Sequence, residues 1–234
     1  MPLPKIDVAT FEMKLPSNGQ KVRYRPFLVK EEKILLIAAE SKDNDQILLA
    51  MDQVISNCLI DKIDIEDVPS FDIEYIFLKL REKSMGEVIK VNVIDPDTNK
   101  KFQVDVDLNK VIVKRSTKHE KRLKLSDALF VEMKYPNMRT ILAVDPSKPL
   151  VENGFNLIIN CIEKIYDKES EYKASEYSKA ELQEFVEQFT QDMYEKLSNF
   201  FDTMPSIYYE SEAVSPFTQK KVKVVLDKFV DFFD

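Results

Sequence analysis

Apolar and polar residues recur with helical spacing in the first part of the chain. The segment 28–60 holds two such stretches, and the polar run SKDND separates them. In the second stretch, apolar residues fall on one face of a helix. These residues are Leu48, Met51, Ile55, Cys58 and Leu59. The pattern therefore predicts helices within 28–60, divided at the polar run.

A further helix is predicted over residues 70–85. Ser70 can cap its first turn, and Asp72 in that turn favours the positive end of the helix dipole. Gly86 follows the last apolar residue, and glycine commonly ends a helix. The residues at both ends of this segment thus predict the same helix.

The segment 87–107 changes to the two-residue period of a strand. Ile89, Val91 and Val93 alternate with polar residues before the turn sequence DPDTNK, and the alternation resumes at Phe102. We predict a β-hairpin here, with further strands to about residue 135.

Helical spacing returns after residue 147. Apolar residues recur there at intervals of four and three. They are Val151, Phe155, Ile158, Ile162 and Ile165. This pattern predicts one helix that runs through Ile165. Ser178 and Glu181 have the spacing of a capping box and predict a second helix that runs to Pro205. A second hairpin is predicted over 207–226.

These elements predict an α+β fold of amphipathic helices and antiparallel β-hairpins. We divide it into an N-terminal α+β region, 1–146, and a C-terminal helical region with a hairpin, 147–234. The sequences IDPDTNKKFQV, residues 94–104, and VSPFTQKKVKV, residues 214–224, share Pro, Thr, Lys-Lys and Val at the same offsets. Two interpretations stay open: a helix-plus-hairpin unit used twice, or a favoured turn sequence that occurs twice by coincidence.

Composition restricts the function. The chain has 234 residues, a net charge of −7 and only three glycines. A phosphate-binding loop needs more glycine than this, so nucleotide-binding motifs of that kind are excluded. The first residues, MPLPKIDVATFEMKLP, lack the features of a secretory signal, and no apolar run approaches 18 residues. We expect a protein that acts in the cytoplasm without contacting a membrane.

Residues that could carry chemistry are few. Cys58 and Cys161 lie in apolar helical patterns and are expected to be buried, reduced thiols, with a disulfide as the alternative. Asp95 and Ser215 occupy turn positions where a zinc site would need a thiolate. His119, the single histidine, lies in the polar stretch KRSTKHEKRLK and is expected to be solvated. We therefore predict no catalytic residue, metal, cofactor or small-molecule substrate.

One segment is strongly basic in an otherwise acidic chain. Residues 110–124, called the basic segment below, carry seven Lys or Arg residues and one Glu. An acidic protein surface, a phosphate group or solvent alone could face them. The net negative charge and the absence of aromatic residues from this segment favour the protein over nucleic acid. The candidate partner-binding residues are Lys110, Lys114, Arg115, Lys118, Lys121, Arg122 and Lys124, with Lys100, Lys101, Lys220 and Lys221 of the two hairpins.

Several stretches, taken in order, resemble the baseplate hub family of T4-like contractile-tailed bacteriophages. They are VRYRPFLVKEEKILLIAAES, VPSFDIEYIFLKLREKSMGE, VEMKYP, FNLIINCIEKIYD and FVDFF. The resemblance extends from about residue 20 to the end. It implies a non-enzymatic tail morphogenesis protein, either a structural component or an assembly chaperone of the central hub. Its partners would be other baseplate and tail hub proteins.

The resemblance also places such a protein in the host cytoplasm during assembly, with the virion tail as a second location. Some members of that family carry metal-type cysteine pairs in the hairpins, and this chain lacks them. The alternative function, from a different class, is a nucleic-acid-associated protein that binds through residues 110–124. Binding to DNA that weakens with salt would support that alternative.

Overall fold

The computed structural model describes residues 7–41, 43–145 and 147–232. The chain divides into two units by its internal packing. The first unit contains the described residues of 1–65, 71–114 and 206–234, and the second contains 66–70 and those of 115–205. The division into regions 1–146 and 147–234 that the sequence predicted stays a prediction.

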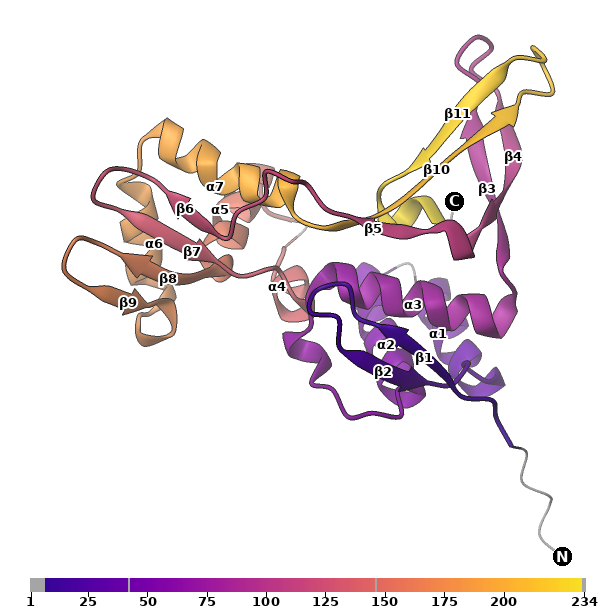
Figure 1. Cartoon of the computed structure of the whole chain (residues 1–234), viewed down its shortest axis with the longest axis horizontal. Helices are drawn as coiled ribbons and strands as arrows, with labels where there is room; N and C mark the ends of the chain where they lie inside the picture. Colours follow the sequence, from indigo (N-terminus) through magenta and orange to yellow (C-terminus); the bar gives the residue numbers. More distant parts are fainter. Residues whose placement is uncertain (1–6, 42, 146, 233–234) are drawn as a thin grey trace, which may run out of the picture. The chain divides into compact units, whose positions relative to one another are not determined.

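Three helices and a small hairpin form one part of the first unit (Figure 1). Their bounds are β1 Phe11–Lys14, β2 Lys21–Tyr24, α1 Val29–Ser41, α2 Asn44–Cys58 and α3 Ser70–Met85. Asp43 is the N-cap of α2, because its carboxylate accepts hydrogen bonds from the N–H groups of Asp45 and Gln46. Val54, Ile55 and Cys58 of α2 are fully buried, and so α2 supplies much of the core here.

Two antiparallel hairpins form the rest of the first unit and lie side by side in Figure 1. The first hairpin pairs β3 Val88–Ile94 with β4 Lys101–Asp107, and the second pairs β10 Ser206–Val214 with β11 Lys221–Leu226. The short strand β5, Ile112–Lys114, pairs with β10. Alternate side chains point inward and form one buried cluster. It includes Ile89, Val91, Val106, Ile207, Tyr209 and Val224 of the strands, together with Leu78 of α3 and Phe232.

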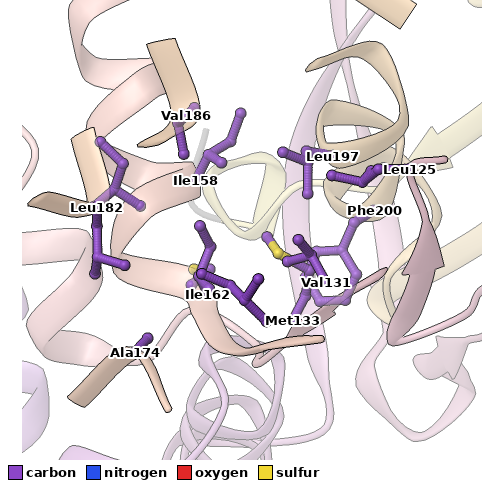
Figure 2. Close-up of a cluster of buried hydrophobic side chains, with 13 residues drawn as sticks. Leu125, Val131, Met133, Ile158, Ile162, Ala174, Leu182, Val186, Leu197 and Phe200 are labelled. Atoms are coloured by element: carbon purple, nitrogen blue, oxygen red, sulfur yellow. The ribbon is translucent and has the colours of Figure 1, made fainter. Parts of the chain in front are cut away.

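The second unit is built on a four-stranded antiparallel sheet with the order β6-β7-β8-β9. The strands are β6 Arg122–Lys124, β7 Phe130–Met133, β8 Ile162–Tyr166 and β9 Glu171–Lys173. The helices are α4 Met138–Leu142, α5 Leu150–Cys161, α6 Lys179–Glu187 and α7 Gln191–Thr203. Figure 2 shows the core of this unit, where Met133 and Ile162 of the sheet meet side chains of α5, α6 and α7, such as Ile158, Leu182 and Leu197.

The predicted α+β class is confirmed, as are several elements. Two helices fall within 28–60, the third helix spans Ser70–Met85, and Gly86 after it has a positive φ of 109°. The hairpin strands run over 88–107 and 206–226, close to the predicted ranges. Cys58 and Cys161 are both buried and free, in agreement with the thiol prediction. Burial raises the pKa of Cys58 to about 11 and that of Cys161 to about 12.

Two helix predictions were wrong. The helix expected to run through Ile165 ends at Cys161, and Ile162 and Ile165 belong to β8. Isoleucine is favoured in strands, and pairing with β7 and β9 decides the conformation of this segment. The single helix expected from Ser178 to Pro205 is two helices, because Thr190 starts a new one by accepting a hydrogen bond from the N–H of Met193.

Candidate partner-binding surface

The tips of the two hairpins, residues 95–100 and 215–220, have the same backbone conformation. The N–H of Asp95 donates to the carbonyl of Lys100 at 2.9 Å, and the N–H of Ser215 donates to that of Lys220 at 2.9 Å. Asn99 and Gln219 both have a positive φ of 57°. The similar sequences of the two tips therefore form similar turns.

Asp95 and Ser215 play the same part within their tips. Both are fully buried. A carboxylate oxygen of Asp95 accepts hydrogen bonds from the N–H groups of Asp97 and Thr98, each at 2.9 Å. The hydroxyl oxygen of Ser215 accepts from those of Phe217 and Thr218 at 3.1 and 3.3 Å. Each side chain thereby holds its own turn closed.

Side chains also join one tip to the other. The hydroxyl of Thr218 donates to the second carboxylate oxygen of Asp95 at 3.0 Å, and the ammonium of Lys220 lies 2.6 Å from the carboxylate of Asp97. The rings of Phe102 and Phe217 meet edge to face, with centroids 6.4 Å apart. These contacts fix the two tips as one surface.

The charge of Asp95 is well compensated. A hydrogen bond from Ser215 has the largest effect on its carboxyl and lowers its pKa; burial opposes this, and the N–H of Thr98 and the hydroxyl of Thr218 lower the pKa further. The pKa of Asp95 therefore lies well below its usual range, and the side chain is ionised at neutral pH. A zinc site would need thiolates at positions 95 and 215. The side chains there are the carboxylate of Asp95 and the hydroxyl of Ser215, and both are hydrogen-bonded.

The hairpin lysines differ in how they are engaged. Lys220 pairs with Asp97, Lys221 pairs with Glu212 at 2.7 Å, and the ammonium of Lys100 lies 5.4 Å from the centroid of the Phe217 ring. Lys101 is exposed and has no ion pair among the residues that the structure describes. Of the four candidate hairpin lysines, Lys101 is thus the one with the greatest freedom to meet a partner.

The basic segment is divided between the two units. Lys110 and Lys114 belong to the first unit. Lys110 lies 3.7 Å from the carboxylate of Asp107, and the ammonium of Lys114 lies 4.3 Å from the centroid of the Tyr208 ring. The rest of the segment belongs to the second unit and is described separately.

In the second unit, aromatic rings engage two of the basic side chains. Lys121 lies 4.4 Å from the centroid of the Tyr135 ring, and Arg122 lies 4.2 Å from that of Tyr166. Such cation–π contacts hold a charge near the surface in a defined place. Lys124 pairs with Asp127 at 2.8 Å.

Arg115 and Lys118 are exposed and form no ion pair in the described part of the chain. They are the members of the basic segment that can meet an acidic partner without giving up a contact of their own. The role of this segment in binding stays a prediction.

His119 is half-buried and packed against aromatic rings, so the prediction of a solvated side chain was wrong. Its ring stacks on Tyr135 at a centroid distance of 5.5 Å and lies 4.9 Å from that of Phe200. Nδ1 lies 3.0 Å from the hydroxyl oxygen of Thr203, whose proton goes to the carbonyl of Asn199 at 2.7 Å. Nδ1–H therefore donates, and Nε2 is buried without a hydrogen-bond partner among the described residues.

This environment lowers the pKa of His119. Burial has the largest effect, and the positive charge of Lys121 adds to it. A charged imidazolium would need an acceptor for Nε2–H, and none faces it in the described structure. No local pattern around His119 indicates this environment, because Thr203 lies 84 positions away and Phe200 is almost as distant.

Sequence reasoning also missed a buried ion pair. Glu31 is fully buried, and one of its carboxylate oxygens lies 2.9 Å from the guanidinium of Arg25. The N–H of Leu28 donates to its other oxygen at 2.9 Å. Burial, the largest effect, raises the pKa of Glu31, but the hydrogen bonds from Arg25 and Leu28 together lower it. The ion pair links the start of α1 to the end of β2, and so both charges stabilise the fold.

The described residues contain no group of three or more His, Cys, Asp or Glu side chains placed to hold a metal ion. Nor do they contain a helix both long and apolar enough to cross a bilayer.

Comparison with known families identifies the chain. The family described as "T4 bacteriophage base plate protein" matches residues 8–234. The chain belongs to this family. The match supports a T4-like phage baseplate protein and does not distinguish the hub from other parts of the baseplate. Comparisons with curated proteins and with solved structures returned no significant match.

Proposed function

We propose that this baseplate protein is a non-enzymatic component or assembly factor of the central hub that acts through protein–protein contacts. The family match carries the baseplate part of the proposal. The hub part is supported by the ordered stretches that resemble hub proteins, among them VRYRPFLVKEEKILLIAAES and VPSFDIEYIFLKLREKSMGE. Its partners are other baseplate and tail hub proteins.

The joined hairpin tips are the observation that supports a binding role. A partner meets a surface whose backbone and side chains are already ordered, and so it loses little free energy in ordering them. Lys101 on this surface and Arg115 and Lys118 of the second unit offer positive charge without competing ion pairs in the described structure. An acidic protein surface complements these residues.

Charge reversal tests this proposal. The variant Lys101→Glu, Arg115→Glu, Lys118→Glu should fold normally, because these side chains are exposed. Incorporation into assembled baseplates, measured by quantitative mass spectrometry, should fall at least about tenfold if these charges contribute roughly 1.4 kcal/mol or more to binding.

The matched control is Lys14→Glu, Lys33→Glu, Lys62→Glu, which makes the same change in net charge at exposed lysines outside the hairpins and the basic segment. Normal incorporation of the test variant would remove these residues from the interface. A similar loss in both variants would show that net charge, rather than a surface, is responsible.

Nucleic-acid binding through residues 110–124 is the alternative. A net charge of −7 opposes it, and the phosphate contacts that drive such binding weaken as salt rises. We expect the purified protein to show no salt-dependent binding to duplex or single-stranded DNA, measured by fluorescence anisotropy at low and high salt. Binding lost on adding salt would favour the alternative.

A further inference from the structure

The second unit contains a cavity of about 410 Å³, and its described lining shares no residue with the hairpin tips or the basic segment. Its apolar wall includes Leu129, Ile165, Leu182 and Phe185. Leu182, labelled in Figure 2, is shared between this wall and the buried core of the unit. The wall is therefore held in place by the sheet and by α6, and the cavity does not depend on a loop alone.

Two tyrosines and two carboxylates complete the lining. Tyr172 and Tyr177 meet edge to face with ring centroids 6.4 Å apart. Asp167 and Glu181 line the same cavity, and among the described residues no basic side chain lines it. Apolar surface combined with negative charge thus defines what the cavity can accept.

Both carboxylates are ionised at neutral pH. Hydrogen bonds lower the pKa of Asp167, first from the N–H of Glu169 and then from the hydroxyl of Tyr172. The hydroxyl of Ser178, followed by its N–H, lowers the pKa of Glu181. Acidic residues also outnumber lysines in the surrounding segment, 166–187. An acidic occupant would be repelled here, and a basic one attracted.

The same hydrogen bonds argue for a peptide segment over a small polar molecule. Asp167 is occupied by two N–H groups of its own turn and by the hydroxyl of Tyr172 at 2.8 Å. Glu181 is occupied by the N–H and hydroxyl of Ser178, both at 2.7 Å. These hydrogen bonds take both oxygens of Asp167 and one oxygen of Glu181, so the charge of both groups remains while fewer acceptor sites are left to orient a polar ligand. Apolar contact must therefore provide most of the fit.

We propose that this cavity receives an apolar side chain from a partner baseplate protein, in a segment where Lys or Arg flanks that side chain. The apolar group contacts Leu129, Leu182 and Phe185, and the flanking cation meets Asp167 or Glu181. The exposed ring of Tyr177 offers the cation an additional π face. The identity of the partner as a baseplate protein rests on the proposed function, whereas the chemistry of the occupant rests on the cavity.

Titration of the full chain with short peptides tests the chemistry. The probes are acetyl-Lys-Phe-Arg-amide, acetyl-Glu-Phe-Glu-amide and acetyl-Lys-Ala-Arg-amide, followed by NMR of labelled tyrosines. We expect saturable shifts of the Tyr172 and Tyr177 signals with the first peptide. The Ala and Glu peptides should bind at least about tenfold more weakly, since they lose the buried ring or the charge match.

Neutral substitutions separate charge from folding. Asp167→Asn and Glu181→Gln retain oxygens that can accept the hydrogen bonds of the turn and of the capping box. The double variant should keep its structure and lose the preference for the Lys-Phe-Arg peptide over the Glu-Phe-Glu peptide. Tyr177→Ala should weaken binding of both Phe peptides, whereas Tyr208→Ala, in the first unit, should have no effect.

Three results would overturn the proposal: no saturable binding at the cavity, equal binding of the basic and acidic peptides, or an unchanged preference in the double variant. A photo-cross-linking residue in place of Tyr177 then tests the partner in infected cells, where the captured segment should contain an apolar residue beside Lys or Arg. Peptide binding without any baseplate cross-link would leave the cavity chemistry standing and contradict the proposed function.

Discussion

At the scale of single residues, Asp95 and Ser215 join the tips of the two hairpins. The hydroxyls of Ser215 and Thr218 in one tip both donate hydrogen bonds to the carboxylate of Asp95 in the other. The outcome is a pair of buried hydrogen-bonded groups that close and join the two turns.

The Ser215 hydroxyl should matter for stability. Ser215→Ala leaves the N–H groups of Phe217 and Thr218 without their acceptor and removes a partner of Asp95. We expect the free energy of unfolding to fall by about 1–3 kcal/mol, measured by chemical denaturation. The control is Ser175→Ala at an exposed position, which should change little. Equal stability of the two variants would contradict the account of the joined tips.

His119 should make the protein less stable in mild acid. Its folded pKa is lowered, so between the ordinary value of 6.5 and the folded pKa the unfolded chain binds more protons. The contribution to stability is complete above about pH 6.5 and is lost as the pH falls through the folded value.

NMR titration of this single histidine should give a midpoint below 6.5. In His119→Phe, the part of the stability change between pH 7.5 and 5.5 that comes from this ring should disappear. A midpoint at or above 6.5 would contradict the buried, unpartnered Nε2.

Glu74 should have the opposite effect to His119 on the pH dependence of stability. Burial raises its pKa to about 7, so the folded protein holds a proton that the unfolded chain loses above the ordinary value near 4.5. Stability should therefore fall as the pH rises from 4.5 to 7. Glu74→Gln should raise the free energy of unfolding at pH 8 by up to about 3 kcal/mol and change it little at pH 4. Denaturation at both pH values tests this, and a loss of stability at pH 8 would refute it.

At the scale of elements, local signals predicted those segments whose ends carry their own caps. The α3 helix is the clearest case, since its polar start and Gly86 lie in the sequence itself. The prediction of one helix over 150–166 was wrong because the isoleucines of this segment fit a helix and a strand equally well. Pairing of β8 with β7 and β9 decided between them, and this pairing is a tertiary effect.

The capping box predicted at the start of α6 is present. The hydroxyl of Ser178 accepts from the N–H of Glu181 at 3.3 Å, and the carboxylate of Glu181 accepts from the N–H of Ser178 at 2.7 Å. Ser178→Ala should lower the free energy of unfolding by about 0.5–2 kcal/mol. Thr190→Ala, which removes the cap of α7, should have an effect of similar size. Ser175→Ala again serves as control, and a loss equal to that control would exclude a capping role.

At the scale of the whole molecule, the sequence could predict the mixture of helices and antiparallel hairpins. It could not predict which segments pack into one unit, because a core of the first unit joins residues of 78–111 to residues of 207–232. The basic segment illustrates the consequence. It is continuous in sequence, yet its first part belongs to one unit and the remainder to the other.

The cavity between the sheet and α6 had no sequence signal either. Its lining residues are spread over 129–185, and its tyrosines and carboxylates lie in and beside the polar stretch KESEYKASEY, which has no pattern that indicates a cavity. Only the fold brings these residues against Leu129 and Ile165. A binding role through protein contacts is consistent with both this cavity and the joined hairpin tips, and neither requires enzymatic chemistry.

The most direct measurement is affinity purification of this protein from infected cells at low and high salt, with mass spectrometry of what is recovered and of purified virions. We predict recovery with baseplate hub proteins at both salt concentrations. Presence in virions would identify a structural component, and absence from them an assembly factor. Recovery of nucleic acid alone, lost at high salt, or of no tail protein, would contradict the account.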